Sequence, residues 1–296
     1  MTAGILGPIS GLAAQSALQT QIIELNGRPV RVQTAGISTR RAGSPVVIFE
    51  AGAAHGLDAW GRILRNVAAD APIVAYDRAG LGQSAWDSIT PTPRHVAQRL
   101  RGLLTRLGVA PPYVLVGYSW GGMLVHHYAG HYPTEIAGLV LVDPAPVLTL
   151  SLREHLAPFD SVGASRVGFD AYWSGFASFF TRAAPAVRGE FDVFRSLLTT
   201  ALHERDLRPL PAVPLTVIVA AKYLPIPSLQ VPYDPAAHFD VDLRQRVREF
   251  ERWVSASPRG TLVVSNHTTH AIPREDPDLV LWAVRRVLAA RYQSVP

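Results

Sequence analysis

The sequence predicts an α/β fold built on a mostly parallel central sheet, with an antiparallel hairpin at its start. Short apolar runs typical of buried strands alternate along the chain with helix-compatible stretches, which is the pattern of βαβ units. Asn26-Gly27 separates two runs of β-forming residues and is a strong signal for a hairpin turn. The chain of 296 residues is 48% hydrophobic and 17% charged, a globular composition long enough to bury a sizeable core.

Each expected element follows from its own pattern of residues. Residues 93–107 should form an amphipathic helix, because leucines and Val96 fall on one face and Gly108 can cap its end. Continuously apolar runs such as 46–49 indicate buried strands. The expected strands are residues 21–25, 28–34, 46–49, 73–76, 113–116, 139–142, 215–219 and 262–264, and further helices are expected at 123–132 and 279–290.

One segment interrupts the alternation of strands and helices. Residues 146–211 contain no clear buried strand, so we expect a helical insertion between the first part of the core (21–145) and its second part (212–296). The insertion is rich in aromatic residues, which could be ordinary core side chains or the lining of a cap over a site. We favour the cap. The aromatics are Phe159, Phe169, Tyr172, Trp173, Phe176, Phe179, Phe180, Phe191 and Phe194.

Composition excludes several classes of function. The net charge is +5, but the basic residues are scattered arginines with Lys222 as the only lysine, which indicates a solvated surface and not a nucleic-acid site. The absence of cysteine excludes disulfides and thiolate metal ligands. No stretch reaches the ~20 apolar residues of a membrane span, so no stable membrane insertion is expected.

The first 20 residues are expected to be a flexible leader. They are apolar, lack Lys and Arg, and are interrupted by Gly7, Pro8 and Gly11, so they do not resemble a secretory signal with a positive start. We therefore expect a cytoplasmic protein, with export through an atypical leader as the alternative.

The segment 114–123, VLVGYSWGGM, points to nucleophilic chemistry. It places Ser119 between Gly117 and Gly121, after an apolar strand and before a helix-compatible run. A tight turn in this setting lifts a serine hydroxyl above the sheet, and glycines are needed because side chains there would collide with strand and helix. We predict that Ser119 is a nucleophile; a glycine-rich structural turn is the alternative.

A serine hydroxyl needs an adjacent base, and histidine is suited to this role because its pKa is close to neutrality. Among ten histidines, His270 has the most suitable position, in a short loop after an expected strand and before the final helix. His267 lies in the same loop and is its rival.

Four stretches together resemble the α/β-hydrolase superfamily over about residues 21–291: VLVGYSWGG, FEAGAAHG (49–56), YDRAGLGQS (76–84) and THAIPREDPDLV (269–280). The resemblance implies the α/β-hydrolase fold, with helices on both faces of the sheet and a helical cap. It implies that the N–H groups of Ala53 and Trp120 form an oxyanion hole. Asp77 and Arg78 are expected to be structural and to tie their loop to the serine turn. The expected substrate-binding residues are Gly52, His55, Tyr118 and Trp173.

The acid partner of the histidine departs from the family pattern. The usual Asp follows the strand at 215–219, but this chain has AAKYLPIPSLQ there, with Tyr223 near the expected position. Some members carry the acid after the preceding strand, where this chain has Asp143, and the order Ser119, Asp143, His270 fits the superfamily. Asp143 is therefore the preferred acid. Asp234 and Asp240 remain alternatives.

These residues predict a serine hydrolase that cleaves a carboxylic ester, thioester or lactone of a small molecule with an apolar group, without metal or cofactor. The alternatives are a cofactor-free haloperoxidase-like or lyase enzyme with the same triad, and a non-catalytic ligand-binding protein. Epoxide hydrolases are disfavoured because they need an Asp where this chain has Ser119. The sequence does not determine the oligomeric state.

Overall fold

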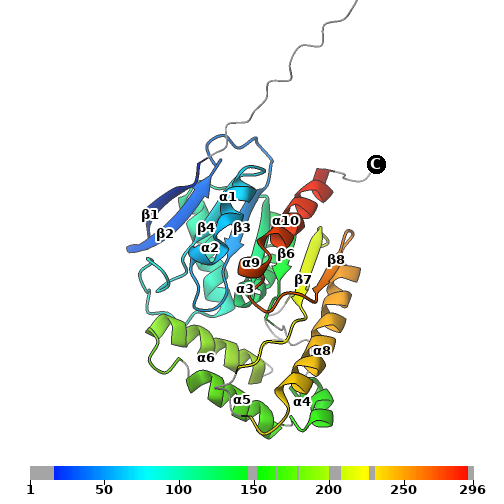
Figure 1. Ribbon diagram of the computed structural model, residues 1–296. Helices are drawn as coiled ribbons and strands as arrows, with labels where there is room; N and C mark the ends of the chain where they lie inside the picture. The colour runs from blue at the N-terminus through cyan, green and yellow to red at the C-terminus, as the bar shows by residue number, and fades with distance from the viewer. Residues whose placement is uncertain are drawn as a thin grey trace, which may run out of the picture.

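The computed structural model describes residues 17–145, 152–164, 166–178, 180–199, 208–226 and 231–292. Eight strands form one sheet in the order β1-β2-β4-β3-β5-β6-β7-β8 (Figure 1). Antiparallel pairing is confined to the β1/β2 hairpin and the β2/β4 pair, and every later pair is parallel, which confirms the expected sheet. The strands are β1 (Gln19–Leu25), β2 (Arg28–Ala35), β3 (Val46–Glu50), β4 (Ile73–Tyr76), β5 (Tyr113–Tyr118), β6 (Ile136–Val142), β7 (Leu215–Ala220) and β8 (Thr261–Ser265).

Helices cover both faces of the sheet, as expected. Successive residues of the central strands alternate between two hydrophobic clusters, because side chains along a strand point to opposite faces. One cluster holds α1 (Arg62–Ala68) and α10 (Pro277–Tyr292) against the sheet. The other holds α2 (Pro93–Arg106), α3 (Trp120–His131) and α8 (Pro235–Ser255). The short elements are η1 (Leu57–Trp60), η2 (Pro133–Glu135) and α9 (Ile272–Glu275).

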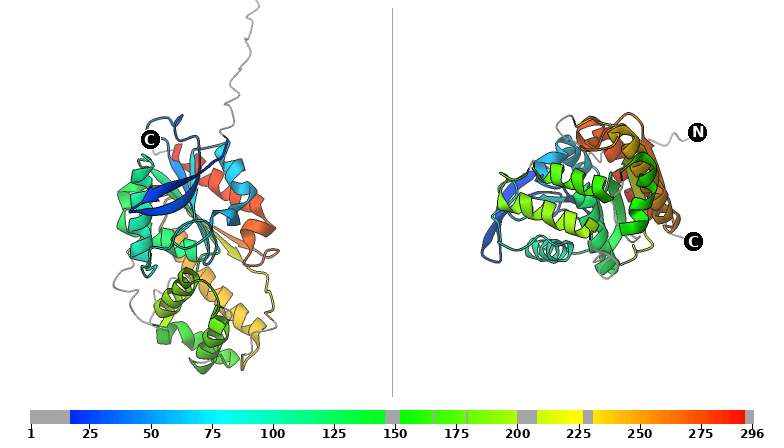
Figure 2. Two further views of the ribbon diagram at one scale, coloured as in Figure 1. Left: turned by 90° about the vertical axis from the view of Figure 1, so that its left-hand side faces the viewer. Right: turned by 90° about the horizontal axis from the view of Figure 1, so that it is seen from below.

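The segment between β6 and β7 contributes only helices in its described parts. They are α4 (Leu152–Leu156), η3 (Ala157–Val162), α5 (Arg166–Ser178) and α6 (Pro185–Thr199), and we call them the inserted helices. They lie together at one end of the molecule, beyond the sheet (Figures 1 and 2). Within this group α6 packs on α3, where the Trp120 and Phe194 rings have centroids 5.5 Å apart.

Some inserted aromatics have a packing role. Phe159 and Phe169 are buried in a cluster that includes Leu156 and Val241 of α8. The side chains of Trp173 and Phe176, and Phe179 as a whole, lie outside the described residues. Most of the expected leader lies outside them as well, and β1 begins at Gln19, two residues before the expected start of the first strand.

The parallel strands bring three loops to one edge of the sheet. β5 lies between β3 and β6, so the segments that follow these three strands are neighbours at their carboxyl ends. The turn after β5 is bonded directly to the end of β6, since the N–H of Ser119 donates to the carbonyl of Val142 at 3.0 Å. Within the described part of the chain, no helix is long and apolar enough to cross a membrane.

Candidate active site

The turn between β5 and α3 places Ser119 in a strained conformation. Ser119 has φ 54° and ψ −121°, a backbone region that non-glycine residues rarely occupy. The flanking glycines are required by close contacts: a Cβ on Gly121 would lie 2.1 Å from the Glu50 carbonyl oxygen, and one on Gly117 would lie 2.5 Å from the Gly121 carbonyl oxygen. Strain of this kind costs about 1–3 kcal/mol and persists only where packing enforces it.

Ser119, His270 and Asp143 form a continuous chain of hydrogen bonds. The Ser119 Oγ lies 2.9 Å from Nε2 of His270, and Nδ1 of His270 lies 2.6 Å from Oδ2 of Asp143. The His270 side chain is 56% exposed, whereas that of Asp143 is 4% exposed. The three residues come from the ends of β5 and β6 and from the loop after β8. This series of hydrogen bonds is open to solvent at the histidine and buried at the carboxylate.

The second oxygen of Asp143 has partners of its own. Oδ1 accepts hydrogen bonds from the N–H of Ala220 at 2.9 Å and from Nη1 of Arg246 at 2.7 Å. Burial by itself would raise the pKa of Asp143, but the charge of Arg246 and the hydrogen bonds from His270 and Ala220 hold that pKa below its ordinary value. The carboxylate therefore stays ionised in a buried position.

The rival residues lie elsewhere. Asp234 caps the start of α8 by accepting the N–H of Ala236 at 2.9 Å, and Asp240 is exposed on that helix. His267 is 65% exposed and its Nε2 lies 2.9 Å from Oδ2 of Asp276. Of the candidate acids, Asp143 is the one whose carboxylate bonds His270.

The loop after β3 lies beside the serine. A Cβ on Gly52 would lie 3.4 Å from the Ser119 Cβ and 3.1 Å from the Tyr118 ring, so a larger residue would have to displace that ring slightly. Ala53 follows at once, and its carbonyl oxygen is 2.7 Å from Nδ1 of the exposed His55. Trp120 is the first residue of α3, so its N–H belongs to the free donors of a helix N-terminus. The oxyanion roles of Ala53 and Trp120 stay predictions.

Tyr118, an expected substrate-binding residue, is 8% exposed and packs in the core. Its ring centroid lies 5.2 Å from that of His270 and 6.3 Å from that of Trp60. Burial and the nearby Asp143 charge raise the pKa of its phenol. Tyr118 therefore packs against the His270 ring from the side of the core. A substrate contact remains a prediction for Tyr118, Gly52 and His55. The side chain of Trp173 lies outside the described residues.

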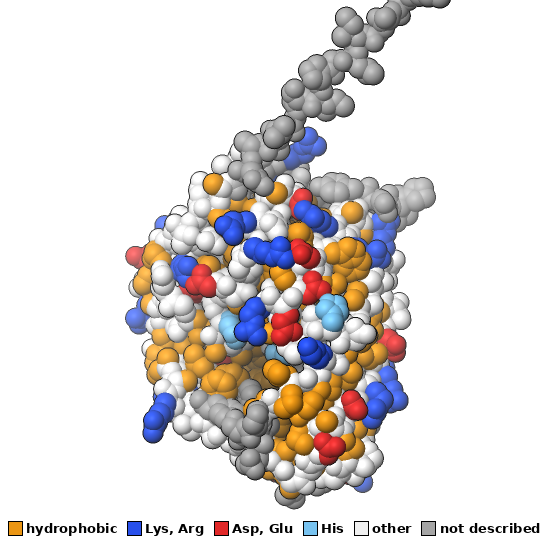
Figure 3. All heavy atoms as spheres, viewed as in Figure 1, with side chains coloured by type: hydrophobic (Ala, Val, Ile, Leu, Met, Phe, Trp, Pro, Cys, Tyr) orange, Lys and Arg blue, Asp and Glu red, His pale blue; other side chains and the backbone are white. Residues whose placement is uncertain are grey.

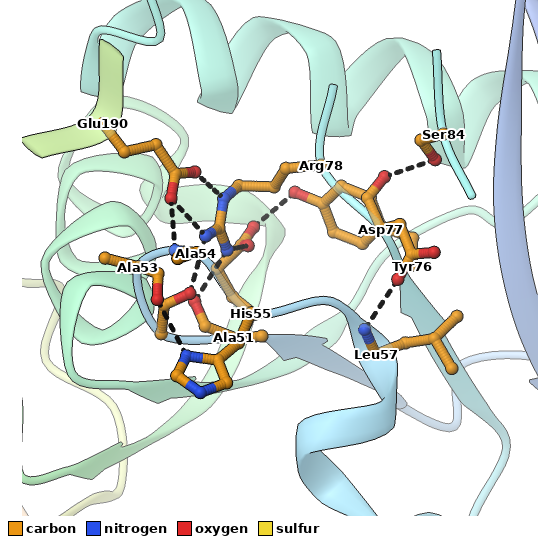
Figure 4. Close-up of polar contacts among 12 residues, drawn as sticks. Ala51, Ala53, Ala54, His55, Leu57, Tyr76, Asp77, Arg78, Ser84 and Glu190 are labelled. Atoms are coloured by element: carbon orange, nitrogen blue, oxygen red, sulfur yellow. Dashed lines mark hydrogen bonds and ion pairs between the residues drawn. The ribbon is translucent and has the colours of Figure 1, made fainter. Parts of the chain in front are cut away.

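A buried ion cluster supports the loop after β3 (Figure 4). Arg78 donates to the carbonyls of Ala51 and Gly52, both at 2.7 Å, and to the carboxylates of Glu50 and Glu190. Arg78 and Asp77 were expected to reach the serine turn. They instead hold the loop after β3, because β4 pairs with β3 while β5 lies on the far side of β3. Within the described chain, no group of three or more His, Asp and Glu side chains could hold a metal ion.

A family model described as the α/β-hydrolase fold matches residues 45–239. The chain belongs to the α/β-hydrolase family. This fold supports a hydrolase activity but does not determine which kind of bond is cleaved.

Curated relatives of this family match over short regions. Uncharacterized protein YqjL of Bacillus subtilis is 33% identical over 99 residues, which are 33% of this chain and 39% of that protein. Lipase LipV of Mycobacterium tuberculosis is 38% identical over 97 residues, which are 32% of this chain and 36% of that protein. The chain thus spans less than two fifths of the length of these relatives. Among solved structures, the epoxide hydrolase CorEH superposes with a TM-score of 0.62 at 16% identity, covering 92% of this chain and 99% of that one, a likeness of fold.

Two residues of this site were missed by sequence analysis. Arg246 lies four residues after Asp242 on α8 and bonds to it at 2.7 Å, so in the sequence the two look like an ordinary surface ion pair. Glu190 lies on α6, in a segment whose only evident signal was its aromatic content. No motif links either residue to its partners, because Arg246 reaches Asp143 and Glu190 reaches Ala54 through the packing of distant helices.

Proposed function

We propose that this protein is a serine hydrolase that cleaves a carboxylic ester, thioester or lactone through an acyl-enzyme on Ser119. The observation that carries the proposal is the hydrogen-bond chain from Ser119 through His270 to the buried, ionised Asp143. The relative named as a lipase is consistent with it. The relative named as an epoxide hydrolase shares the fold alone.

The geometry supports a two-step acyl transfer. His270 Nε2 is placed to accept the Ser119 proton as the hydroxyl attacks a carbonyl, and then to return it to the leaving group. Asp143 holds the Nδ1–H and stabilises the imidazolium that forms. The N–H groups of Ala53 and Trp120 would receive the oxyanion, because both loops border Ser119.

The surroundings support a substrate with an apolar group. Figure 3 shows a hollow in this view of the molecule, with hydrophobic side chains gathered on both sides of it. It lies between the sheet core and the region of the inserted helices, which would then act as the cap (Figures 1 and 3). Pockets lined by apolar side chains with few polar groups typically bind small molecules of matching shape.

Labelling with a fluorophosphonate probe tests the proposal. The folded protein should be labelled and should hydrolyse short p-nitrophenyl esters, and Ser119→Ala should abolish both while keeping the melting temperature within a few degrees. Ser255→Ala removes an exposed hydroxyl at the end of α8 and should change neither. Folded wild-type protein that is neither labelled nor active on an ester, thioester and lactone panel would instead indicate a ligand-binding protein.

A further inference from the structure

We propose that Glu190 of α6 is a positioning residue for the oxyanion hole, so that turnover depends on the docking of an inserted helix against the loop after β3. The inference rests on the proposed acyl-enzyme mechanism, because it concerns the N–H of Ala53 as an oxyanion donor.

The loop on both sides of Ala53 is held by hydrogen bonds to buried charges (Figure 4). Before Ala53, Arg78 donates to the carbonyls of Ala51 and Gly52, both at 2.7 Å. After it, the N–H of Ala54 donates to Oε2 of Glu190 at 2.8 Å. The Ala53 N–H therefore lies between two fixed points, one supplied by the core and the other by α6.

Glu190 also orients the arginine that forms the first fixed point. Nε of Arg78 lies 2.5 Å from Oε1 of Glu190, and Nη2 lies 3.0 Å from Oε2, a bidentate pair. With Glu50 and the two carbonyls, all five N–H donors of the guanidinium are used. Removing Glu190 would leave Arg78 with Glu50 as its one carboxylate partner and take away the bonds at Nε and Nη2 that fix the plane of the guanidinium against the loop.

The loop does not hold this shape by itself. Ala54 has φ 62°, a left-handed conformation that costs a residue with a Cβ free energy and persists only under external restraint. Glu190 supplies the restraint on its N–H. Oxyanion stabilisation depends on donors that are already oriented before the charge develops, so small displacements of the loop reduce the rate of the chemical step more than substrate binding.

The charges of the cluster separate this role from a simple contribution to stability. One buried guanidinium lies between two buried carboxylates, Glu50 and Glu190, and Tyr76 also donates to Glu50. The two carboxylates repel each other, so removing the Glu190 charge relieves this repulsion, while the loss of its hydrogen bonds destabilises the fold. These two effects on stability oppose each other, whereas the loss of loop geometry acts on kcat.

The test compares Glu190→Gln with Asp192→Asn, which removes the same charge from an exposed position on the same helix. A glutamine has one acceptor oxygen in place of two, so in either orientation its NH2 group faces a donor, either Nε of Arg78 or Nη2 and the Ala54 N–H, and the three contacts cannot all be kept. For a p-nitrophenyl ester we expect Glu190→Gln to lower kcat by ~10- to 100-fold with KM within about twofold. The inhibition constant of an alkyl trifluoromethyl ketone, whose adduct with Ser119 carries an oxyanion, should rise by a similar factor. Asp192→Asn should match wild type in all three.

Glu190→Asp provides a second measurement in case the glutamine variant does not fold. It keeps the charge, but its shorter side chain cannot reach both partners, so kcat should fall as in Glu190→Gln. A kcat within twofold of wild type in a folded Glu190 variant, or a loss carried by KM, overturns the positioning role. Hydrolysis that survives Ser119→Ala would instead refute the proposed function, which separates the two failures.

Discussion

At the scale of single residues, the carboxylate of Asp143 is held by more groups than the histidine alone. The charged and titratable groups that face it are His270, Arg246 and Tyr118, and the Ala220 N–H donates to it from β7. Arg246 reaches it from α8 and is itself paired with Asp242. The proton equilibrium of the proposed triad therefore depends on a helix that carries no part of it.

Arg246→Met should make the activity more sensitive to acid. The pKa of Asp143 is held below its ordinary value partly by the Arg246 charge, so its loss should raise that pKa. A carboxylate with a lowered pKa loses its ionised form only as pH falls through the lowered value, and in the variant this loss begins at a higher pH. The acid limb of kcat/KM against pH should accordingly move upward.

The control for this change is Arg244→Met, which removes an exposed arginine from the same helix. It should leave the pH profile at the wild-type position. An Arg246→Met profile that coincides with wild type would mean that the Ala220 N–H and His270 suffice to keep Asp143 ionised.

At the scale of elements, the serine turn depends on how closely α3 approaches β3. A Cβ on Gly121 would lie 2.1 Å from the carbonyl oxygen of Glu50 and 2.5 Å from that of Ala51, and both obstacles are backbone. Neither can rotate away as a flexible side chain could. The glycine is thus a condition for packing the start of α3 on the loop that carries Ala53.

Gly121→Ala should therefore destabilise the fold and displace the loop after β3. We expect a loss of about 1–3 kcal/mol of unfolding free energy, measured by urea denaturation, together with a lower kcat. Gly102→Ala in α2 is the matched control, because its Cβ would meet only the Leu25 side chain at 3.7 Å. That change should stabilise the protein by up to ~1 kcal/mol, since alanine is the better helix former. Equal stability of the two variants would contradict the packing argument.

The element scale also shows where sequence patterns stop being informative. The eight expected strands are present. The first two are marked by the hairpin turn between them, and continuous apolar runs in the central strands leave few alternatives to a buried strand. Helix α8 was not expected: its sequence is polar, and Val241 and Phe250 are its only fully buried side chains. Leu243, Val247, Phe250 and Val254 do recur at helical spacing and pack on the sheet, so a helix was predictable there. Only the tertiary structure shows which face of the sheet this helix covers.

At the scale of the whole molecule, acid stability should depend on a histidine outside the site. His126 in α3 is 3% exposed and its ring centroid lies 4.8 Å from that of Trp253. Burial, and then the nearby His127, lower the pKa of His126 to about 3. In the unfolded chain this imidazole takes up a proton near pH 6.5. Between these values the unfolded state binds the extra proton, so folding free energy is lost as pH falls from 6.5.

His126→Phe should remove this part of the acid sensitivity. Phenylalanine retains a ring against Trp253 and cannot be protonated, so the unfolding free energy of the variant, measured by urea denaturation, should fall less steeply between pH 6.5 and 4 than that of wild type. The difference in slope should be on the order of 1.4 kcal/mol per pH unit. Above pH 7 the two proteins should differ by a constant amount, and parallel curves across the whole range would show that His126 is not the responsible group.

The sequence by itself determined the fold class and the local motifs, and only the tertiary structure decided how the motifs are supported. Ser119 could be singled out because the glycines around it are required locally, and His270 because it stands in a short loop between an expected strand and the final helix. The choice among Asp143, Asp234 and Asp240 could not be made that way, and the structure brings Asp143 to 2.6 Å from the His270 ring nitrogen. Arg246 and Glu190 lie 103 and 136 residues from the atoms they hold, Asp143 Oδ1 and the Ala54 N–H. Such contacts arise from the packing of whole helices against the sheet, which no short stretch of sequence encodes.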